Sequence, residues 1–352
     1  MILVSGTKRS GTSMWMQVLA AAGLPILGKA FPRGWDATIR EANPDGFFES
    51  ILREGIYYRT NPHPVTGDYF LPEHVDGYAV KVFVPGVIRT ERAYIGRLVA
   101  NVREWREYEA SILRLYALER EAMLARDPAA PIAEPFPPAY EWWMENFALV
   151  RDISLRRYPA RLQAYDQVIA APERVIREVL AWIGAGDPEA AIAAVKPERR
   201  TQHRPESQSI DPALARVFDD LYAAIADGKG LSKALLATLN ETNRRLLPQL
   251  VDLQRRVLAS QALSVPLKSI DLAQLRLRRA PLRGKRVVLV DERSLWLADC
   301  DALLTESPKL AVFSAIEVIV ERLDLAPEQR ARLLSELAGD AIREAARRGG
   351  VA

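Results

Sequence analysis

The stretch VSGTKRSGTSMW, residues 4–15, decides how the rest of the chain is interpreted. It overlaps the end of a short β-branched run, Ile2 to Val4, which predicts a buried strand. From Thr12 onward apolar residues recur at helical spacing, and Gly23 followed by Pro25 marks the end of that helix. A strand, a glycine-containing loop and a helix in this order are the context that a phosphate-binding loop requires.

The loop departs at one position from the loop of nucleoside-triphosphate enzymes. Gly6 and Gly11 have the spacing G-x-x-x-x-G, which in those enzymes continues with lysine and then serine or threonine. Here the chain continues with Thr12 and Ser13. The positive charge that would reach the β- and γ-phosphates is therefore missing from its usual place.

The cations of this loop precede its second glycine. Lys8 and Arg9 stand there, and we expect them at the mouth of the loop. The amides and hydroxyls from Ser10 to Ser13 are then free to hold a phosphate at the helix N-terminus. This arrangement suits one phosphate that carries a reactive ester.

Composition limits the classes of protein that fit. The 352 residues are 49% hydrophobic and 26% charged, enough for one large domain with an appendage. The 48 basic and 45 acidic residues leave a formal net charge of only +3, so no nucleic-acid partner is expected. The single cysteine, Cys300, excludes an intramolecular disulfide framework and fits a reducing compartment. Since no apolar run has the length of a signal peptide core or a membrane span, we expect a cytoplasmic protein without a span.

Alternating strands and helices follow the loop, which predicts an α/β fold with a central parallel sheet. Further strands are expected at 78–84, 97–102 and 161–165. Helices are expected at 104–125 and from Pro172 onward, where proline suits the first helical position.

The character of the sequence changes after residue 208. Residues 212–263 predict amphipathic helix, 268–286 a basic connector, and 286–291 a candidate strand. We therefore expect a first domain at 1–208 and a mainly helical C-terminal extension at 209–352. The extension carries no motif with a chemical meaning, and it is a candidate surface for homo-oligomer formation.

The loop resembles a motif of one enzyme family. Residues 8–15, KRSGTSMW, are similar to the loop of sulfotransferases that binds the 5′-phosphosulfate of 3′-phosphoadenosine 5′-phosphosulfate (PAPS). In that family the loop reads Pro-Lys-Ser-Gly-Thr-Thr-x-Trp, or Arg-Ser-Gly-Thr-Ser in relatives. By this resemblance Arg9 lies beside the bridging oxygen of the donor. Lys8 and the residues from Ser10 to Ser13 bind the phosphosulfate.

A second segment matches the same family. Its members bind the 3′-phosphate with an arginine at the end of a strand and a serine eight residues later. Arg103 ends the strand expected at 97–102, and Ser111 lies eight residues later. An arginine fork and a hydroxyl from the next turns suit phosphate oxygens. The family's usual Asn-Pro or Asp-Pro after the arginine is replaced here by Glu104 and Trp105.

A third segment, YDQVIAAPE at 165–173, is similar to the Tyr-Glu-Asp-Leu-x-x-x-Pro-Glu segment after the last core strand of the family. By that resemblance Tyr165 lies near the adenine. The three segments cover about residues 1–205 in the order of the family. They imply a P-loop-like three-layer α/β/α fold, with PAPS as donor and 3′-phosphoadenosine 5′-phosphate (PAP) as product.

The expected proton acceptor differs from that of the cytosolic branch of the family. There a histidine in Lys-Thr-His-Leu-Pro is the base, but residues 81–85 have Phe83 in that place. Residues 43–49, NPDGFFE, instead resemble the Asn-x-x-Gly-Phe/Trp-Glu element of bacterial sulfotransferases. Glu49 is thus the candidate base beside two aromatic rings, and Lys81 is the candidate cation for the sulfuryl oxygens.

Other assignments stay open in the sequence. His63 and His74 are alternative bases, and Arg199 and Arg200 are weak candidates for a late nucleotide clamp. No cysteine or histidine spacing suggests a metal. The expected activity is sulfuryl transfer to a hydroxyl or amine of a small molecule or carbohydrate. The alternatives are a magnesium-dependent small-molecule kinase on ATP, and a catalytically silent relative that binds a partner through its tail.

Overall fold

The computed structural model describes residues 1–31, 43–63, 66–126, 128, 135–200 and 205–264, together with three short strands between 268 and 298. Two compact units are present. The first consists of Met1–Ala122 and Pro137–Arg245, and the second of Met123–Phe136 and Leu246–Ala352. All expected site residues lie in the first unit.

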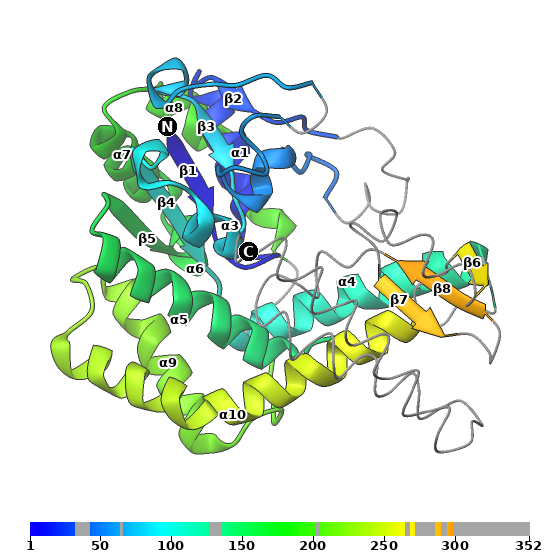
Figure 1. Cartoon of the computed structure of the whole chain (residues 1–352). Coiled ribbons are helices and arrows are strands. Elements are labelled where there is room, and N and C mark those ends of the chain that lie inside the picture. The colour runs from blue at the N-terminus through cyan, green and yellow to red at the C-terminus, as the bar shows by residue number, and fades with distance from the viewer. Residues whose placement is uncertain are drawn as a thin grey trace. The chain divides into compact units, whose positions relative to one another are not determined.

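A five-stranded parallel sheet forms the centre of the first unit (Figure 1). The strand order is β2 (Ile26–Leu27), β3 (Ala79–Lys81), β1 (Ile2–Ser5), β4 (Arg97–Val102) and β5 (Ala160–Ala164). Each neighbouring pair is parallel. The α/β fold with a parallel sheet that the sequence predicts is confirmed.

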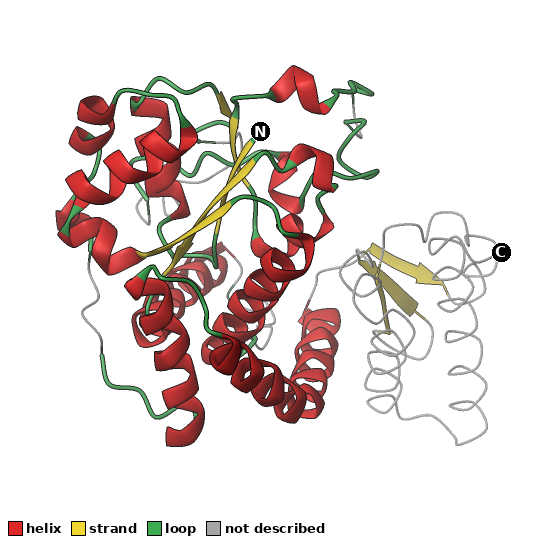
Figure 2. Ribbon diagram, turned by 90° about the vertical axis from the view of Figure 1, so that its left-hand side faces the viewer, coloured by secondary structure: helices red, strands yellow, loops and turns green. Residues whose placement is uncertain are grey.

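Alternate residues of the strands enter two separate cores, as the period of two in a strand requires. Ile2, Val4, Ala79 and Val99 pack with α1 (Thr12–Ala21), α7 (Pro172–Ile183) and α8 (Pro188–Ala193). Leu3, Val80, Leu98 and Ala100 pack on the opposite face with α3 (Val84–Arg89) and α5 (Pro138–Arg156). Helices thus cover both faces of the sheet, as Figure 2 shows.

Several helices begin and end where the sequence predicts. Pro172 opens α7, and Gly184 ends it in the left-handed conformation at φ 80°. The helix expected at 104–125 is α4, Trp105–Arg126, and the strand expected at 97–102 is β4. Short elements complete this unit: η1 (Ile51–Glu54), η2 (Pro72–Val75), η3 (Arg92–Tyr94), α6 (Tyr165–Ala170) and η4 (Pro197–Arg199).

Two of the predicted strands have the wrong bounds. The strand expected at 78–84 is only Ala79–Lys81, because Pro85 sits in the first turn of α3 and fixes a helical start there. The strand expected at 161–165 ends at Ala164, and Tyr165 is the first residue of α6. Tyr165 is therefore not on a strand but at the carboxyl edge of the sheet.

Helix α9 (Pro212–Asp227) belongs to the first unit, although the sequence places it in the extension. Phe218 of α9 is fully buried and stacks on Trp142 and Trp143, with ring centroids 5.1 Å apart in both pairs. It also meets the edge of Trp105 at 5.9 Å. Trp142 and Trp143 are thus core residues. The two compact units therefore do not divide at residue 208.

The last part of the described chain is helix followed by strand. Helix α10 (Lys233–Ser264) leads to β6 (Lys268–Asp271), β7 (Arg286–Leu289) and β8 (Ser294–Ala298). The three strands form an antiparallel sheet in the order β6-β8-β7. The strand expected at 286–291 is confirmed in its first four residues, whereas the connector expected at 268–286 begins with a strand. Its residues 272–285, and the part of the expected extension after residue 298, lie outside the described residues.

Candidate functional site

The loop between β1 and α1 has a backbone that only glycine accommodates at two places. Gly6 and Gly11 have φ angles of 151° and 97°. A Cβ atom on Gly6 would lie 2.2 Å from the carbonyl oxygen of Asn101, and one on Gly11 would lie 2.6 Å from its Nδ2. The loop therefore runs against the end of β4, and the amide of Asn101 donates a hydrogen bond to the carbonyl of Ser10.

The start of α1 has no side-chain cap among the described residues. Gly11 is the N-cap residue in a left-handed conformation. The backbone N–H groups of the first turn lack intrahelical acceptors, and the helix dipole adds partial positive charge there. Three hydroxyls, on Ser5, Thr7 and Ser10, are buried and have no hydrogen-bond partner in the part of the chain that the structure describes. Unpaired buried donors beside an uncapped helix N-terminus fit an anion with several acceptor oxygens.

Arg9 joins the loop to helix α4. Its Nε donates to Ser111 Oγ over 3.3 Å, and its carbonyl accepts from Arg103 Nη1 over 3.2 Å. Arg9 also has φ 64°, a left-handed conformation that a side chain rarely adopts. The residues expected at the two phosphates thus meet in the folded chain.

The electrostatic environment of Arg9 favours an anion. Burial lowers the pKa of the Arg9 guanidinium, and the charge of Arg103 lowers it further, while Tyr165 acts in the opposite direction. Lys8 is exposed at the same loop, and its charge opposes the burial effect that raises the pKa of Glu119. Clustered cations in a partly buried place are stabilised by a bound anion.

Arg103 is 5% exposed and makes contacts on several sides. Its Nε donates to Glu107 Oε2 over 3.3 Å, and its guanidinium lies 4.8 Å from the centre of the Tyr165 ring. Glu107, itself 1% exposed, also accepts from Arg200 Nη2 over 2.5 Å. The structure thus brings Arg200 to Arg103 through a shared carboxylate. The side chain of Arg199 lies outside the described residues.

Tyr165 contacts both the loop and Arg103. A Cβ atom on Gly11 would be 2.8 Å from its Cδ2, so the ring packs directly on the start of α1. Burial raises the pKa of Tyr165, and the charge of Arg103 opposes that effect. The ring is therefore an apolar wall beside both expected phosphate positions.

A second cluster surrounds Glu49 and meets α1 at Ser13. Lys81 Nζ donates to Glu49 Oε1 over 3.1 Å, to Ser13 Oγ over 3.2 Å and to the carbonyl of Phe47 over 3.2 Å. Arg53 Nη1 donates to Glu49 Oε2 over 2.7 Å. The carboxylate lies between two cations and not only beside the apolar rings that the sequence suggests. The cluster touches the phosphate-binding loop through Ser13.

Burial and Glu49 have opposite effects on the pKa of Lys81. Lys81 is 5% exposed, and burial lowers the pKa of its ammonium, while the neighbouring Glu49 raises that pKa. The ammonium lies 6.0 Å from the centre of the Phe47 ring and 5.8 Å from that of Phe83. Phe83, which stands where the cytosolic enzymes have histidine, therefore packs beside the Glu49 and Lys81 pair. Phe48, next to Glu49, has φ 55°.

The two alternative histidine bases bond to their own segments. His63 Nδ1 accepts from the amide of Thr66 over 3.2 Å, and His74 Nδ1 accepts from the amide of Leu71 over 3.3 Å. Glu49, in contrast, is joined to the loop through Lys81 and Ser13. The geometry favours Glu49 over either histidine as the group beside the loop.

Three residues of this site are missing from the sequence-based assignment: Arg53, Asn101 and Glu107. Arg53 and Glu107 stand four residues after Glu49 and Arg103, a spacing that can signal an ion pair on one helical face. Asn101 has no such local signal, because its role depends on β4 lying next to β1.

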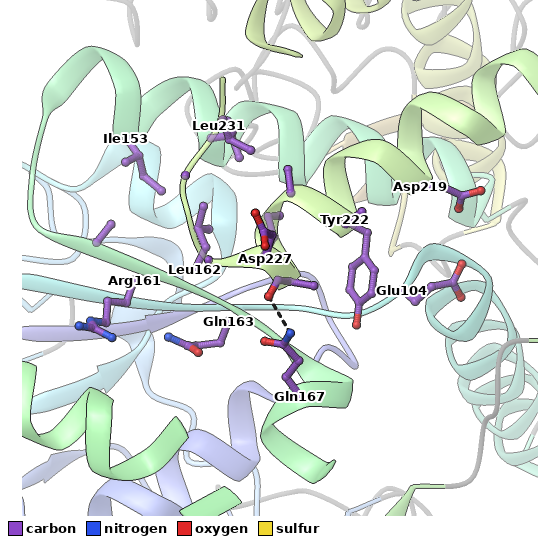
Figure 3. A pocket seen from close by; sticks show the side chains of 18 of the residues that line it. Glu104, Ile153, Arg161, Leu162, Gln163, Gln167, Asp219, Tyr222, Asp227 and Leu231 are labelled. Atoms are coloured by element: carbon purple, nitrogen blue, oxygen red, sulfur yellow. Dashed lines mark hydrogen bonds between the residues drawn. The ribbon is translucent and has the colours of Figure 1, made fainter. Parts of the chain in front are cut away.

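A cavity of about 1360 Å³ lies elsewhere in the first unit, along the free edge of β5 (Figure 3). Residues of α5, α7 and α9 line it together with β5, and Gln167 donates to the carbonyl of Ala226 at its side. None of the residues predicted from the sequence for the site lines this cavity. The candidate site is therefore the loop between β1 and α1 and not this cavity, because unpaired donors and cations meet at the loop.

Within the described ranges, no group of three or more histidine, cysteine, aspartate or glutamate side chains is arranged to hold a metal ion. In the same part of the chain, no helix has both the length and the apolar character that a membrane crossing needs. Comparison of the chain with models of known protein families and with curated proteins gives no match.

Proposed function

We propose that the chain is a sulfotransferase that moves a sulfuryl group from PAPS to a hydroxyl or amine of a small molecule or carbohydrate. The observation that supports it most is the contact of Arg9 with both Ser111 and Arg103. Two elements that the family resemblance assigns to two phosphates of one nucleotide are hydrogen-bonded neighbours here. The fold that we propose for this activity is the P-loop-like three-layer α/β/α fold.

The donor would be held at its two ends by different elements. The uncapped start of α1 and the hydroxyls of Ser10, Thr12 and Ser13 would receive the 5′-phosphosulfate, with Lys8 and Arg9 at the mouth. Arg103 and Ser111 would receive the 3′-phosphate, since Arg103 Nη2 donates to none of the described residues. Tyr165 would pack against the adenine, because its ring adjoins both places.

The chemistry follows from the cluster beside Ser13. Sulfuryl transfer resembles phosphoryl transfer, in which an enzyme mainly aligns the partners and neutralises charge on the leaving oxygen. Glu49 would take the proton of the acceptor hydroxyl as the oxygen–sulfur bond forms. The bond between sulfur and the nucleotide phosphate oxygen breaks, and its electron pair stays on that oxygen, where Lys81 and Arg9 supply positive charge.

Ligand-induced stabilisation tests the donor. PAP without magnesium should raise the midpoint of thermal unfolding, because a ligand that binds only the folded state stabilises it. ATP with magnesium should have a smaller effect. The reverse order would favour the magnesium-dependent kinase and contradict the proposal.

Transfer of label tests the reaction. The protein is incubated with sulfur-labelled PAPS and fractions of hydroxyl-bearing compounds, and label should appear in an acceptor. Glu49→Gln should lower the rate by about 10²–10⁴-fold while PAP still stabilises the variant. Binding of PAP without transfer to any acceptor, together with no effect of Glu49→Gln, would identify a silent relative instead.

A further inference from the structure

The two cations on Glu49 are placed differently. Lys81 is almost fully buried and bonds to Ser13 of the phosphate-binding loop as well as to Glu49. The side chain of Arg53 is 41% exposed and bonds to the other carboxylate oxygen. One cation thus faces the expected donor, and the other faces solvent, from which an acceptor would arrive.

Lys81 has no spare donor. An ammonium has three N–H groups, and its three acceptors are Glu49 Oε1, Ser13 Oγ and the Phe47 carbonyl. Lys81 can therefore bind an oxygen of an incoming group only by giving up one of these bonds. An anion at the loop would attract the ammonium, because opposite charges interact strongly where water is excluded. Burial lowers the pKa of Lys81, and Glu49 acts in the opposite direction.

Arg53 is held in place independently of the loop. It stands on η1, where its guanidinium lies 5.9 Å from the centre of the Phe83 ring and its Nε lies 3.4 Å from Glu54 Oε1. Its bond to Glu49, at 2.7 Å, is shorter than the 3.1 Å bond from Lys81. Arg53 can therefore keep the carboxylate in position when Lys81 turns to another oxygen.

We propose that Arg53 is a positioning residue that keeps the Glu49 carboxylate directed at the acceptor while Lys81 transfers its hydrogen bond to the sulfuryl oxygens. This inference rests on the proposed function. The acceptor O–H proton moves to a Glu49 oxygen, the acceptor oxygen bonds to sulfur, and the leaving phosphate oxygen keeps the electron pair of the broken bond. Arg53 takes no part in these bond changes and acts through Glu49.

The test compares kcat and KM for the full chain, for Arg53→Gln, and for Arg53→Gln combined with Glu49→Gln. The kcat of Arg53→Gln should fall by at least about tenfold at an unchanged KM for PAPS, because the carboxylate loses its orientation. Combined with Glu49→Gln, the change at Arg53 should cost no further rate, since a residue that acts only through Glu49 has no effect once that carboxylate is gone. Arg53→Lys should recover part of the rate. Stabilisation by PAP should be unchanged in Arg53→Gln and Arg53→Lys.

Glu54→Gln is the matched control, because it removes the second partner of Arg53 and leaves the bond to Glu49. Its kcat and KM should match those of the unchanged protein. If Arg53→Gln leaves kcat unchanged, or lowers it as much with Glu49→Gln as without, Arg53 does not act through Glu49 and the inference is wrong, while the proposed function stands. If the unchanged protein neither binds PAP nor transfers label, both are wrong. A loss of kcat that disappears in the Glu49→Gln background, with normal PAP binding, supports both.

Discussion

Arg9 and Ser111 are 102 positions apart in the sequence, yet Nε of the arginine donates to the hydroxyl of the serine over 3.3 Å. The bond is possible because β4 lies directly beside β1, so that α4 starts next to the loop after β1. A loop and a helix that are expected to bind different phosphates therefore share one arginine.

Arg103→Ala should weaken binding of PAP by about 1.5–3 kcal/mol, which is one to two orders of magnitude in Kd. The reason is the loss of charge-assisted hydrogen bonds to the 3′-phosphate. Calorimetric titration measures it, and adenosine 5′-phosphate, which lacks that phosphate, should bind the variant and the unchanged protein equally. Arg120→Ala, at an exposed residue of α4, is the control. An equal loss for both nucleotides would place Arg103 elsewhere.

Gly11→Ala should destabilise the fold and remove PAP binding. The new Cβ would clash with Asn101 and Tyr165, and the left-handed φ of 97° adds about 1–2 kcal/mol of backbone strain. Gly23→Ala is the matched control, since Gly23 has φ 85° but no heavy atom within 4 Å of an added Cβ. Chemical unfolding should show a larger loss for Gly11→Ala. Equal losses would mean that strain alone, and not the close approach of Asn101, explains the glycine.

Phe218→Ala should lower the free energy of unfolding by about 3–5 kcal/mol, because it opens a cavity among buried aromatic rings. Leu155→Ala, at a side chain 69% exposed, should change it by less than about 0.5 kcal/mol. Urea unfolding curves compare the two. A small effect at Phe218 would show that α9 contributes little to the first unit.

Lys81 should make stability depend on pH in a way that Lys81→Met abolishes. Burial lowers the Lys81 pKa below its ordinary value of 10.5, so at alkaline pH below 10.5 the unfolded chain binds more protons than the folded one. The free energy of unfolding due to this group therefore rises with pH up to 10.5, by at most about 1.4 kcal/mol per pH unit. Urea unfolding at several pH values measures the free energy of unfolding of both proteins. The value for the unchanged protein minus the value for Lys81→Met should rise as the pH approaches 10.5. A constant difference would contradict the prediction.

Much of the fold could be predicted because its signals are local. The β-branched run at Ile2, the glycines of the loop and Pro172 each act within a few residues, and β4 matches its expected bounds. The place of α9 in the first unit has no such local signal. It depends on the packing of Phe218 on Trp142, and these two residues lie far apart in the sequence.

The site could be predicted only in part for the same reason. Arg103 and Ser111 follow from a spacing, and the structure places both beside the loop. The pairing of Glu49 with Lys81 depends on a bond across 32 positions, and the support of Arg9 by Arg103 on one across 94. Sequence patterns indicate the type of side chain at such places but not which partner it meets.

The indole of Trp142 donates to the carbonyl of Arg103 over 2.7 Å, and Phe218 stacks on that indole. The backbone of Arg103, the residue proposed for the 3′-phosphate, is thus held by a helix from the second half of the chain. A fragment cut at residue 208 would lose this support and expose three tryptophan rings to water. A shortened form of this protein that keeps the proposed site would therefore have to retain α9.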